Sequence, residues 1–170
     1  MTVVPGVTTA RLHGSRLHSE DFETLCGLHR DPAVMATLGG VRPDERTREY
    51  VVENLAHWDR HGYGLWIFRD RATGAFVGRG GLRHVTLEDT PEIEVTYALA
   101  QAAWGQGYAT EIASASLDVG VRQLGLTDIV AFAEPENRAS RRVMEKVGFT
   151  YERDIVWHGV RCVLYRIRAS

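Results

Sequence analysis

Hydrophobic and polar positions change their spacing several times along the chain, and each change marks an expected element. Short apolar or alternating runs predict strands at residues 9–16, 64–70, 75–85, 92–100, 128–133, 149–156 and 160–167, with a turn at 72–74. The clearest alternation lies in 92–100, where one face carries Glu92, Glu94, Thr96 and Ala98 and the other carries Ile93, Val95, Tyr97 and Leu99. This segment therefore predicts a strand with two chemically different faces.

Helical spacing separates these strands. Ser19 is a candidate N-cap for a helix that turns Phe22, Leu25, Cys26 and Leu28 inward and stops at Asp31-Pro32. A second helix is expected from Asp44 to about Arg60, burying Val51, Val52, Leu55 and Trp58. A third helix has its inward face at Ala109, Ile112, Ala113, Ser116, Leu117, Gly120, Val121 and Leu124, and a fourth spans about 137–147. The order β-α-α-β-β-β-α-β-α-β-β predicts an α+β fold with a mixed sheet and helices on both faces.

Composition narrows the class of protein. The 170 residues carry a formal charge of −2, 44% are hydrophobic, and no repeat or linker divides them, so we expect one domain over residues 1–170. No run approaches the roughly 18 apolar residues of a membrane span, and the N-terminus lacks the apolar core of a signal peptide. Cys26 and Cys162 match no metal or disulfide spacing. These features predict a cytoplasmic protein with no membrane partner.

The charged residues raise two alternatives. Every basic residue except Lys146 is an arginine, which either reflects GC-rich codons or marks sites where guanidinium groups bind phosphate or carboxylate in a bidentate manner. Acidic residues offset the arginines and no long basic run occurs, so no nucleic-acid partner is expected. Only His57 and His61 share a helical face, and no glutamate of a zinc-protease motif lies between them. We therefore expect no metal site.

A glycine turn is the first candidate binding element. In WGQGYAT (104–110) two glycines join a strand to a helix, so backbone N–H groups and the positive end of the helix dipole converge on one point. Pyrophosphate is the ligand that such a turn favours. The segment lacks the third glycine of a Rossmann fingerprint and the lysine of a P-loop, and a simple chain reversal is the alternative.

Three segments together resemble the GNAT superfamily of N-acetyltransferases, especially its ribosomal-protein N-terminal acetyltransferase branch. They are the E-x-x-Y-x-L strand (Glu94, Tyr97, Leu99), W-G-Q-G-Y-A-T-E (104–111) and N-R-A-S-R-R-V-M-E-K-V-G-F (137–149), and the likeness extends over nearly the whole chain. The resemblance implies a mostly antiparallel central sheet, splayed where the cofactor binds. Trp104 stands where the wider superfamily has Gln or Arg. The side-chain contact of that Gln or Arg is therefore not expected here, and only the backbone contacts of this position are.

The resemblance also implies acetyl-CoA as the cosubstrate and assigns its contacts. The pantetheine arm is expected along the main chain of Tyr97, Ala98 and Leu99, extending the strand as an added edge would. The pyrophosphate is expected on the amides of the loop and helix start, at Gly105, Gln106, Gly107, Tyr108, Ala109 and Thr110, and Trp104 is also expected to contact the cofactor. Asn137 is expected to contact the pantetheine arm besides capping its helix, and Arg142 to contact the 3′-phosphate.

Acetyl transfer needs a neutral amine, a stabilised oxyanion and a proton for the departing thiolate. Glu94 matches the family's base, with Glu92 as the reserve candidate and a solvated surface carboxylate as the alternative reading. A backbone N–H near Ala98 or Leu99 is the expected oxyanion donor. Ser140 is the expected proton donor, unless its hydroxyl only bonds to the local backbone, and Tyr151 is a weaker candidate. Neither cysteine matches a nucleophile motif, which favours direct attack in a ternary complex.

The acceptor is the least determined part. An amine acceptor, either a protein N-terminus or a small molecule, follows from the resemblance, and a homodimer is possible. Residues 31–62 are expected to form much of the acceptor wall, with Met35, Arg42, Glu45, Trp58 and His61 as its chemistry-bearing side chains. A non-catalytic acyl-CoA-binding regulator and a transferase using a larger donor such as succinyl-CoA are the competing functions. The larger acid would need a cationic partner in the pocket.

Overall fold

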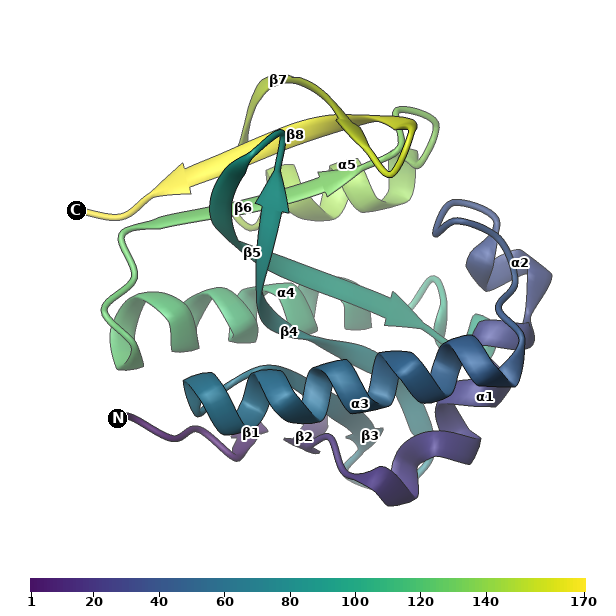
Figure 1. Ribbon diagram of the computed structural model, residues 1–170. Helices are drawn as coiled ribbons and strands as arrows, with labels where there is room; N and C mark the ends of the chain where they lie inside the picture. The colour runs from purple at the N-terminus through teal and green to yellow at the C-terminus, as the bar shows by residue number, and fades with distance from the viewer.

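The computed structural model describes residues 1–170 and contains one eight-stranded sheet (Figure 1). In space the strands follow the order β1-β2-β3-β4-β5-β6-β8-β7. All neighbouring pairs are antiparallel except β5 and β6, which are parallel. The strand bounds are β1 Gly6–Thr8, β2 Leu12–Arg16, β3 Leu65–Asp70, β4 Phe76–Leu87, β5 Thr90–Leu99, β6 Asp128–Ala133, β7 Thr150–Trp157 and β8 Val160–Arg168.

Helices cover both faces of this sheet (Figure 1). They are α1 Phe22–Arg30, α2 Pro32–Met35, α3 Asp44–His61, α4 Tyr108–Asp118 and α5 Arg138–Lys146, with 3-10 turns η1 Ser19–Asp21 and η2 Gln101–Ala103 and a π-helical turn η3 Val119–Gln123. One cluster of buried apolar residues lies against α1 and α3, and another includes residues of α4. Alternate residues of β3 point to opposite faces of the sheet, so Leu65 and Ile67 belong to the first cluster, while Trp66 and Phe68 belong to the second. No helix of the protein is long and apolar enough to cross a bilayer.

The mixed fold and the mostly antiparallel sheet are confirmed, as is the division of faces on β5. Val95 and Leu99 pack in the α4 core, whereas Ala98 packs in the core under α1 and α3. The break at Asp31-Pro32 is also confirmed. The Asp31 carboxylate accepts the Ala33 N–H at 2.9 Å and caps the short helix α2.

Three local predictions are wrong. The strand expected at 9–16 starts only at Leu12, as β2, because the Thr9 hydroxyl accepts the Leu12 N–H at 3.0 Å and residues 9–11 turn the chain from β1 into β2. Ser19 is not a cap, since the His18 N–H donates to the Asp21 carboxylate at 2.8 Å instead. Val52 is 60% exposed, because the inward face of α3 runs through the polar or amphipathic positions Thr47, Tyr50 and Asn54 before Trp58.

The parallel pair at the centre of the sheet is its least regular part. The register between β5 and β6 contains only Glu94 opposite Val130, although both strands continue beyond these residues. The two strands diverge after that pair, so the β6-facing edge of β5 from Val95 to Leu99 has no strand partner. An unpaired strand edge inside the molecule can accept an extended ligand.

Candidate active site

A cavity of about 1320 Å³ lies where β5 and β6 diverge. Its walls come from the segment between α2 and α3, from β4, β5 and β6, and from the starts of α4 and α5. The sequence-predicted site residues in its lining are Glu94, Tyr97, Ala98, Leu99, Trp104, Gly105, Gly107, Tyr108, Ala109, Thr110, Asn137 and Ser140. Gln106 and Arg142 lie outside the lining. Residues from distant parts of the sequence thus meet in one cavity.

The glycine loop forms one end of the cavity. Gly105 and Gly107 have φ angles of 73° and 82°, in the left-handed region that favours glycine. Gly107 is the N-cap of α4, and the N–H groups of Gly105, Gln106 and Gly107 donate to no backbone carbonyl. The first turn of a helix adds further N–H groups without an intrahelical partner. The loop therefore offers a set of free amides at a helix N-terminus, which suits an anion.

An arginine that sequence reasoning missed holds this loop in place. The Arg11 guanidinium donates to the Gln106 carbonyl at 2.8 Å and to the Glu111 carboxylate at 3.0 Å, and stacks 4.2 Å from the centre of the Tyr108 ring. Gln106 itself points along the loop, where its side-chain amide donates to the Ala102 carbonyl at 3.1 Å. Nothing in the sequence around Arg11 shows that it reaches residues 106–111.

Trp104 connects the loop to the end of β5. Its indole N–H donates to the Leu99 carbonyl at 3.0 Å while the residue stays 47% exposed. The Leu99 carbonyl therefore already has a donor, and the rest of the β5 edge is left for a ligand. Where the wider superfamily has Gln or Arg, Trp104 thus links the glycine loop to the end of β5 through this hydrogen bond.

Glu94 lines the cavity five residues before Leu99 on β5, roughly 17 Å from the strand end that leads into the loop, and is 3% exposed. Its carboxylate accepts from Arg83 Nε at 2.6 Å, and the two residues face each other across β4 and β5. Burial raises the pKa of Glu94, and the guanidinium groups of Arg83 and Arg79 act in the opposite direction. The reading of Glu94 as a solvated surface carboxylate does not hold.

Glu92, the reserve candidate, is occupied elsewhere. Both of its carboxylate oxygens accept from Arg166, at 2.8 and 3.0 Å, and it does not line the cavity. Arg166 also forms ion pairs with Asp128 and Glu152, so this cluster of charged residues links the four strands β5, β6, β7 and β8. Glu92 has a structural role in this arrangement.

Ser140 belongs to a small polar network at the start of α5. Its hydroxyl lies 2.9 Å from the Tyr97 hydroxyl, and Tyr97 also donates to the Ser140 carbonyl at 3.1 Å. The Asn137 side chain accepts the Ser140 N–H at 3.1 Å, as an N-cap, and donates to the Thr37 hydroxyl at 3.1 Å. Desolvation raises the pKa of Tyr97 to about 12. Tyr151, in contrast, is 54% exposed and bonds to Asp154.

Sequence reasoning gave the Tyr97 side chain no role and missed its contact with Ser140. The two residues are 43 positions apart, and only the packing of α5 on α4 and β6 brings their hydroxyls together. The acceptor wall was also only partly foreseen. Arg42 lines the cavity, while Met35 and Trp58 are buried in the cores and neither Glu45 nor His61 belongs to the lining.

Basic residues of α5 lie near the cavity mouth. Arg138 is exposed and lines the cavity, and Arg142 is exposed with no ion pair. Arg141 instead donates to the Pro135 carbonyl at 3.1 Å and to the Tyr165 hydroxyl. The role of Arg142 at a 3′-phosphate therefore stays a prediction.

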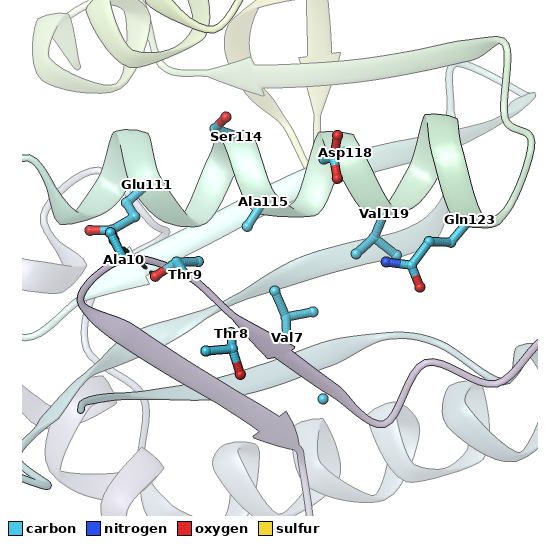
Figure 2. A pocket seen from close by; sticks show the side chains of 11 residues that line it. Val7, Thr8, Thr9, Ala10, Glu111, Ser114, Ala115, Asp118, Val119 and Gln123 are labelled. Atoms are coloured by element: carbon cyan, nitrogen blue, oxygen red, sulfur yellow. Dashed lines mark hydrogen bonds between the residues drawn. The ribbon is translucent and has the colours of Figure 1, made fainter.

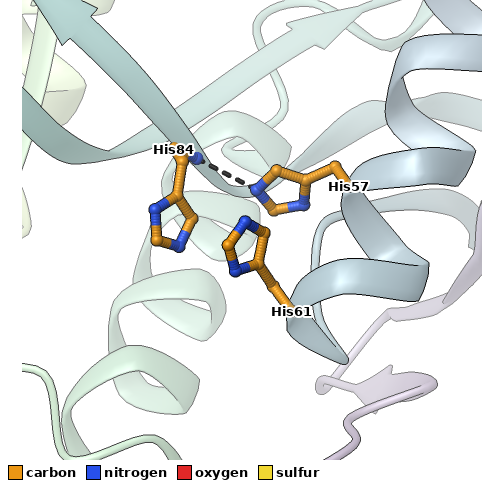
Figure 3. Close-up of side chains that lie close together, drawn as sticks. All are labelled: His57, His61 and His84. Atoms are coloured by element: carbon orange, nitrogen blue, oxygen red, sulfur yellow. Dashed lines mark hydrogen bonds between the residues drawn. The ribbon is translucent and has the colours of Figure 1, made fainter.

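The structure adds His84 to the pair His57 and His61 (Figure 3). One ring nitrogen of each lies within 4.8 Å of the others, and the rings of His61 and His84 stack at 3.8 Å. His57 Nδ1 bonds to the Tyr63 carbonyl at 3.0 Å, and His57 Nε2 accepts the His84 N–H at 3.0 Å. Both nitrogens of His57 thus have protein partners, so the cluster is explained by packing of α3 on β4.

A smaller pocket of about 470 Å³ lies between the β1–β2 hairpin and α4 (Figure 2). Glu111 is its most prominent polar group, but its carboxylate already accepts from the Thr9 hydroxyl at 2.8 Å and from Arg11. These bonds hold the hairpin on α4 and already engage both oxygens of the Glu111 carboxylate.

The chain matches a known protein-family model. Residues 11–150 match the model described as "Acetyltransferase (GNAT) domain". YkkB of Bacillus subtilis is 36% identical over 150 residues, covering 88% of this chain and 87% of that protein. The FsC-acetyl coenzyme A-N(2)-transacetylase of Aspergillus fumigatus is 31% identical over 156 residues, covering 86% of this chain and 66% of that protein.

Solved structures agree on the fold. An acetyltransferase from Agrobacterium tumefaciens superposes with a TM-score of 0.86 at 26% identity, covering 99% of this chain and 97% of the other. The ribosomal L7/L12 α-N-protein acetyltransferase RimL, solved in complex with coenzyme A, has a TM-score of 0.79 at 16% identity, covering 96% and 97%. At that identity, RimL supports the fold alone.

Proposed function

The chain belongs to the GNAT acetyltransferase family, and from this premise we propose that it transfers an acetyl group from acetyl-CoA to a primary amine by direct attack in a ternary complex. The observation that carries the proposal is the single cavity that joins free loop amides, an unpaired strand edge, the buried Glu94 and the Ser140 hydroxyl. The Aspergillus relative, whose name describes acetyl transfer from coenzyme A to a nitrogen, supports the same donor and acceptor chemistry.

The residues present suit coenzyme A. The amides of Gly105, Gln106 and Gly107 and the start of α4 would hold the pyrophosphate. The β5 edge from Tyr97 to Leu99 would pair with the pantetheine arm. Asn137 would contact the same arm through the amide that now donates to Thr37, and Arg142 would reach the 3′-phosphate.

Glu94 is the proposed base. An amine must lose a proton to react, and a carboxylate whose pKa is raised by burial accepts one more readily than an exposed one. Arg83 fixes its orientation through the 2.6 Å hydrogen bond. The proton moves from the amine to Glu94, directly or through a water molecule.

Ser140 and Tyr97 are the proposed source of the proton for the thiolate. The raised pKa of Tyr97, about 12, keeps its hydroxyl protonated at neutral pH, and the 2.9 Å contact links it to Ser140. Ser140 would give its proton to the sulfur and recover one from Tyr97, and solvent would return a proton to Tyr97 once the products leave. An N–H near Ala98 or Leu99 is the proposed oxyanion donor.

An acetyl-enzyme intermediate is disfavoured by the state of the cysteine in the cavity. Cys162 lines the cavity, but burial raises its thiol pKa to about 11, so the reactive thiolate is scarce at neutral pH. Cys26 is buried under α3, and burial raises its thiol pKa too. Direct attack by the amine needs neither cysteine.

The test is release of coenzyme A from acetyl-CoA in the presence of a panel of amines, with the acetylated product identified by mass. The panel pairs peptides of varied N-termini with small amines, because the ribosomal-protein branch rests on fold likeness alone. Turnover with any amine supports the transferase. Saturable acetyl-CoA binding without turnover on the whole panel would instead support the non-catalytic regulator.

A further inference from the structure

The end of the cavity around Glu94 contains more positive than negative charge. Arg42, Arg79 and Arg83 all line it, and Glu94 is the carboxylate among them. Arg79 and Arg83 lie on the same face of β4, since they are four residues apart, and they face Ala98 and Glu94 across the pairing with β5. Arg83 alone is paired with Glu94. Two guanidinium groups therefore remain without a counter-charge.

Arg79 is the more unusual of the two. It is only 4% exposed, yet no carboxylate lies within ion-pair distance of it. Its Nε donates to His29 Nε2 at 3.2 Å, and burial lowers the pKa of His29 to about 3, so this partner is neutral. A buried charge without an ionic partner is unfavourable and usually marks a place where a ligand supplies the opposite charge.

Tyr50 connects the two unpaired arginines. The guanidinium of Arg79 lies 4.9 Å and that of Arg42 lies 5.2 Å from the centre of the Tyr50 ring. The Tyr50 hydroxyl is buried and has no hydrogen-bond partner, although the residue lines the cavity. Buried hydroxyls are nearly always bonded in proteins. This place thus combines two unpaired cations with an unused hydroxyl donor.

The electrostatics of these two arginines agree with an anion-binding site. Burial, followed by the charge of Arg79, lowers the pKa of Arg42. Burial also lowers the pKa of Arg79. An anion between them would reverse both effects, since an opposite charge stabilises the protonated form.

We propose that Arg42, Arg79 and the Tyr50 hydroxyl bind a carboxylate of the acceptor, so that the substrate is an amino acid rather than a neutral or polycationic amine. The inference rests on the proposed function and specifies its substrate. The same wall holds Glu94, so a carboxylate bound at the arginines leaves the amine of the same molecule on the side of the base. A guanidinium binds a carboxylate through two parallel hydrogen bonds, which suits this ligand class.

A dicarboxylic acyl donor such as succinyl-CoA could supply the same carboxylate. Arg42 and Arg79 line the cavity together with Glu94, the proposed base, which acts on the acceptor amine and not on the acyl donor. The acceptor is therefore the source to which we assign the carboxylate. The experiment distinguishes the two sources directly.

The test compares α- and ω-amino acids with their carboxamides as acceptors for acetyl-CoA. Each pair differs only in the negative charge. We expect kcat/KM to be at least tenfold higher for the acids, because a hydrogen-bonded charge pair that is not made leaves buried donors unpaired. Equal values for acid and amide would overturn the proposal, as would faster transfer from succinyl-CoA than from acetyl-CoA to a neutral amine.

Three variants assign the preference to the site. Arg42→Gln and Arg79→Gln should reduce the acid-to-amide ratio to about one, mainly through KM for the acid. Tyr50→Phe should reduce the ratio severalfold, and it should fold normally because it removes only a hydroxyl that has no partner. Arg48→Gln is the matched control, since Arg48 lies on α3, the helix that carries Tyr50, and is exposed and outside the cavity.

A binding measurement tests this inference independently of the proposed function. Amino acids and their carboxamides are titrated into the protein in the presence of coenzyme A, and heat or the shift in Tm is measured. If no amine is acetylated, the proposed function fails, but tighter binding of the acids that disappears in Arg42→Gln and weakens severalfold in Tyr50→Phe still supports the anion site. Equal binding of acids and amides overturns it, whatever the activity.

Discussion

The two ends of the cavity differ in the groups that they offer to a ligand: one offers main-chain groups and the other side chains. The end at the glycine loop consists of main-chain amides of residues 105–107, the start of α4 and the free edge of β5. The end around Glu94 consists of charged and aromatic side chains that come from four separate segments, namely Arg42, Tyr50, Arg79, Arg83 and Glu94. The first can recognise a ligand that all relatives share, because backbone groups are the same in any sequence. The second can change its ligand by single substitutions.

This difference explains why the donor is easier to assign than the acceptor. A loop with left-handed glycines and a helix N-terminus binds phosphate through geometry that a short motif encodes. Acceptor recognition depends on which side chains point into the cavity and on whether they are already paired. The following substitutions test this division.

The largest expected effect is at the side-chain end. Glu94→Gln keeps an acceptor for Arg83 but removes the base, so kcat should fall by about 100-fold or more while KM for acetyl-CoA stays unchanged. Steady-state kinetics measures both. Glu92→Gln is the control: it should lower the free energy of unfolding through the loss of the Arg166 pair without a comparable loss of rate. A Glu94→Gln enzyme of normal rate would exclude Glu94 as the base.

A smaller loss is expected at the junction of the two ends. Ser140→Ala and Tyr97→Phe should each lower kcat roughly tenfold. The double variant should be little slower than the worse single variant, because both act on one proton path. The Ser140→Ala change leaves the backbone cap with Asn137 intact, so helix α5 is preserved. Fully multiplicative losses would show that the two hydroxyls act independently.

The glycine-loop end of the cavity is tested by a substitution that strains the backbone of the loop. Gly107→Ala forces an alanine to a φ of 82°, which should cost about 1 kcal/mol of stability and raise KM for acetyl-CoA severalfold. Gly125→Ala is a matched control with a φ of 67°, open surroundings and a place outside the cavity. Chemical denaturation should show similar losses for both variants. A similar rise in KM for both would mean that the loop has no special role in binding.

The smallest effect is expected at the cavity mouth. Arg142→Ala should weaken binding of CoA about fivefold and leave dephospho-CoA unchanged, because the two ligands differ only in the 3′-phosphate. Calorimetric titration measures both dissociation constants. Arg138→Ala provides the comparison, since Arg138 lines the cavity and Arg142 does not. If the difference appears in Arg138→Ala instead, the phosphate contact belongs to Arg138.

Most elements could be predicted because their signals are local. The strand at 128–133 is β6 with the same bounds, and the helix expected from Asp44 to about Arg60 is α3, which ends one residue later. The errors arose where a polar side chain changed a boundary, as Thr9 does between β1 and β2. They also arose where a helix buries polar positions, as α3 does at Thr47 and Asn54. Periodicity of apolar residues contains no information about either.

The site divides in the same way. Gly105, Gly107, Glu94, Asn137 and Ser140 could be named from motifs and all of them line the cavity. The contacts of Arg11 with Gln106 and Glu111, the Tyr97–Ser140 contact and the Arg83–Glu94 pair could not, because each joins residues that are 11 to 100 positions apart. No spacing rule connects such partners before the strands are aligned.

By itself, the sequence determined the family, the mixed fold and the backbone elements that suit coenzyme A, because those properties depend on local conformation and short-range pattern. Only the tertiary structure decided the charge balance around Glu94. Whether an arginine is paired depends on distances across the sheet, and Arg79 is left buried without a carboxylate while Arg166 has three. An excess of arginine in the composition therefore becomes informative at one cluster, where folding brings the charges together and gives them no partner.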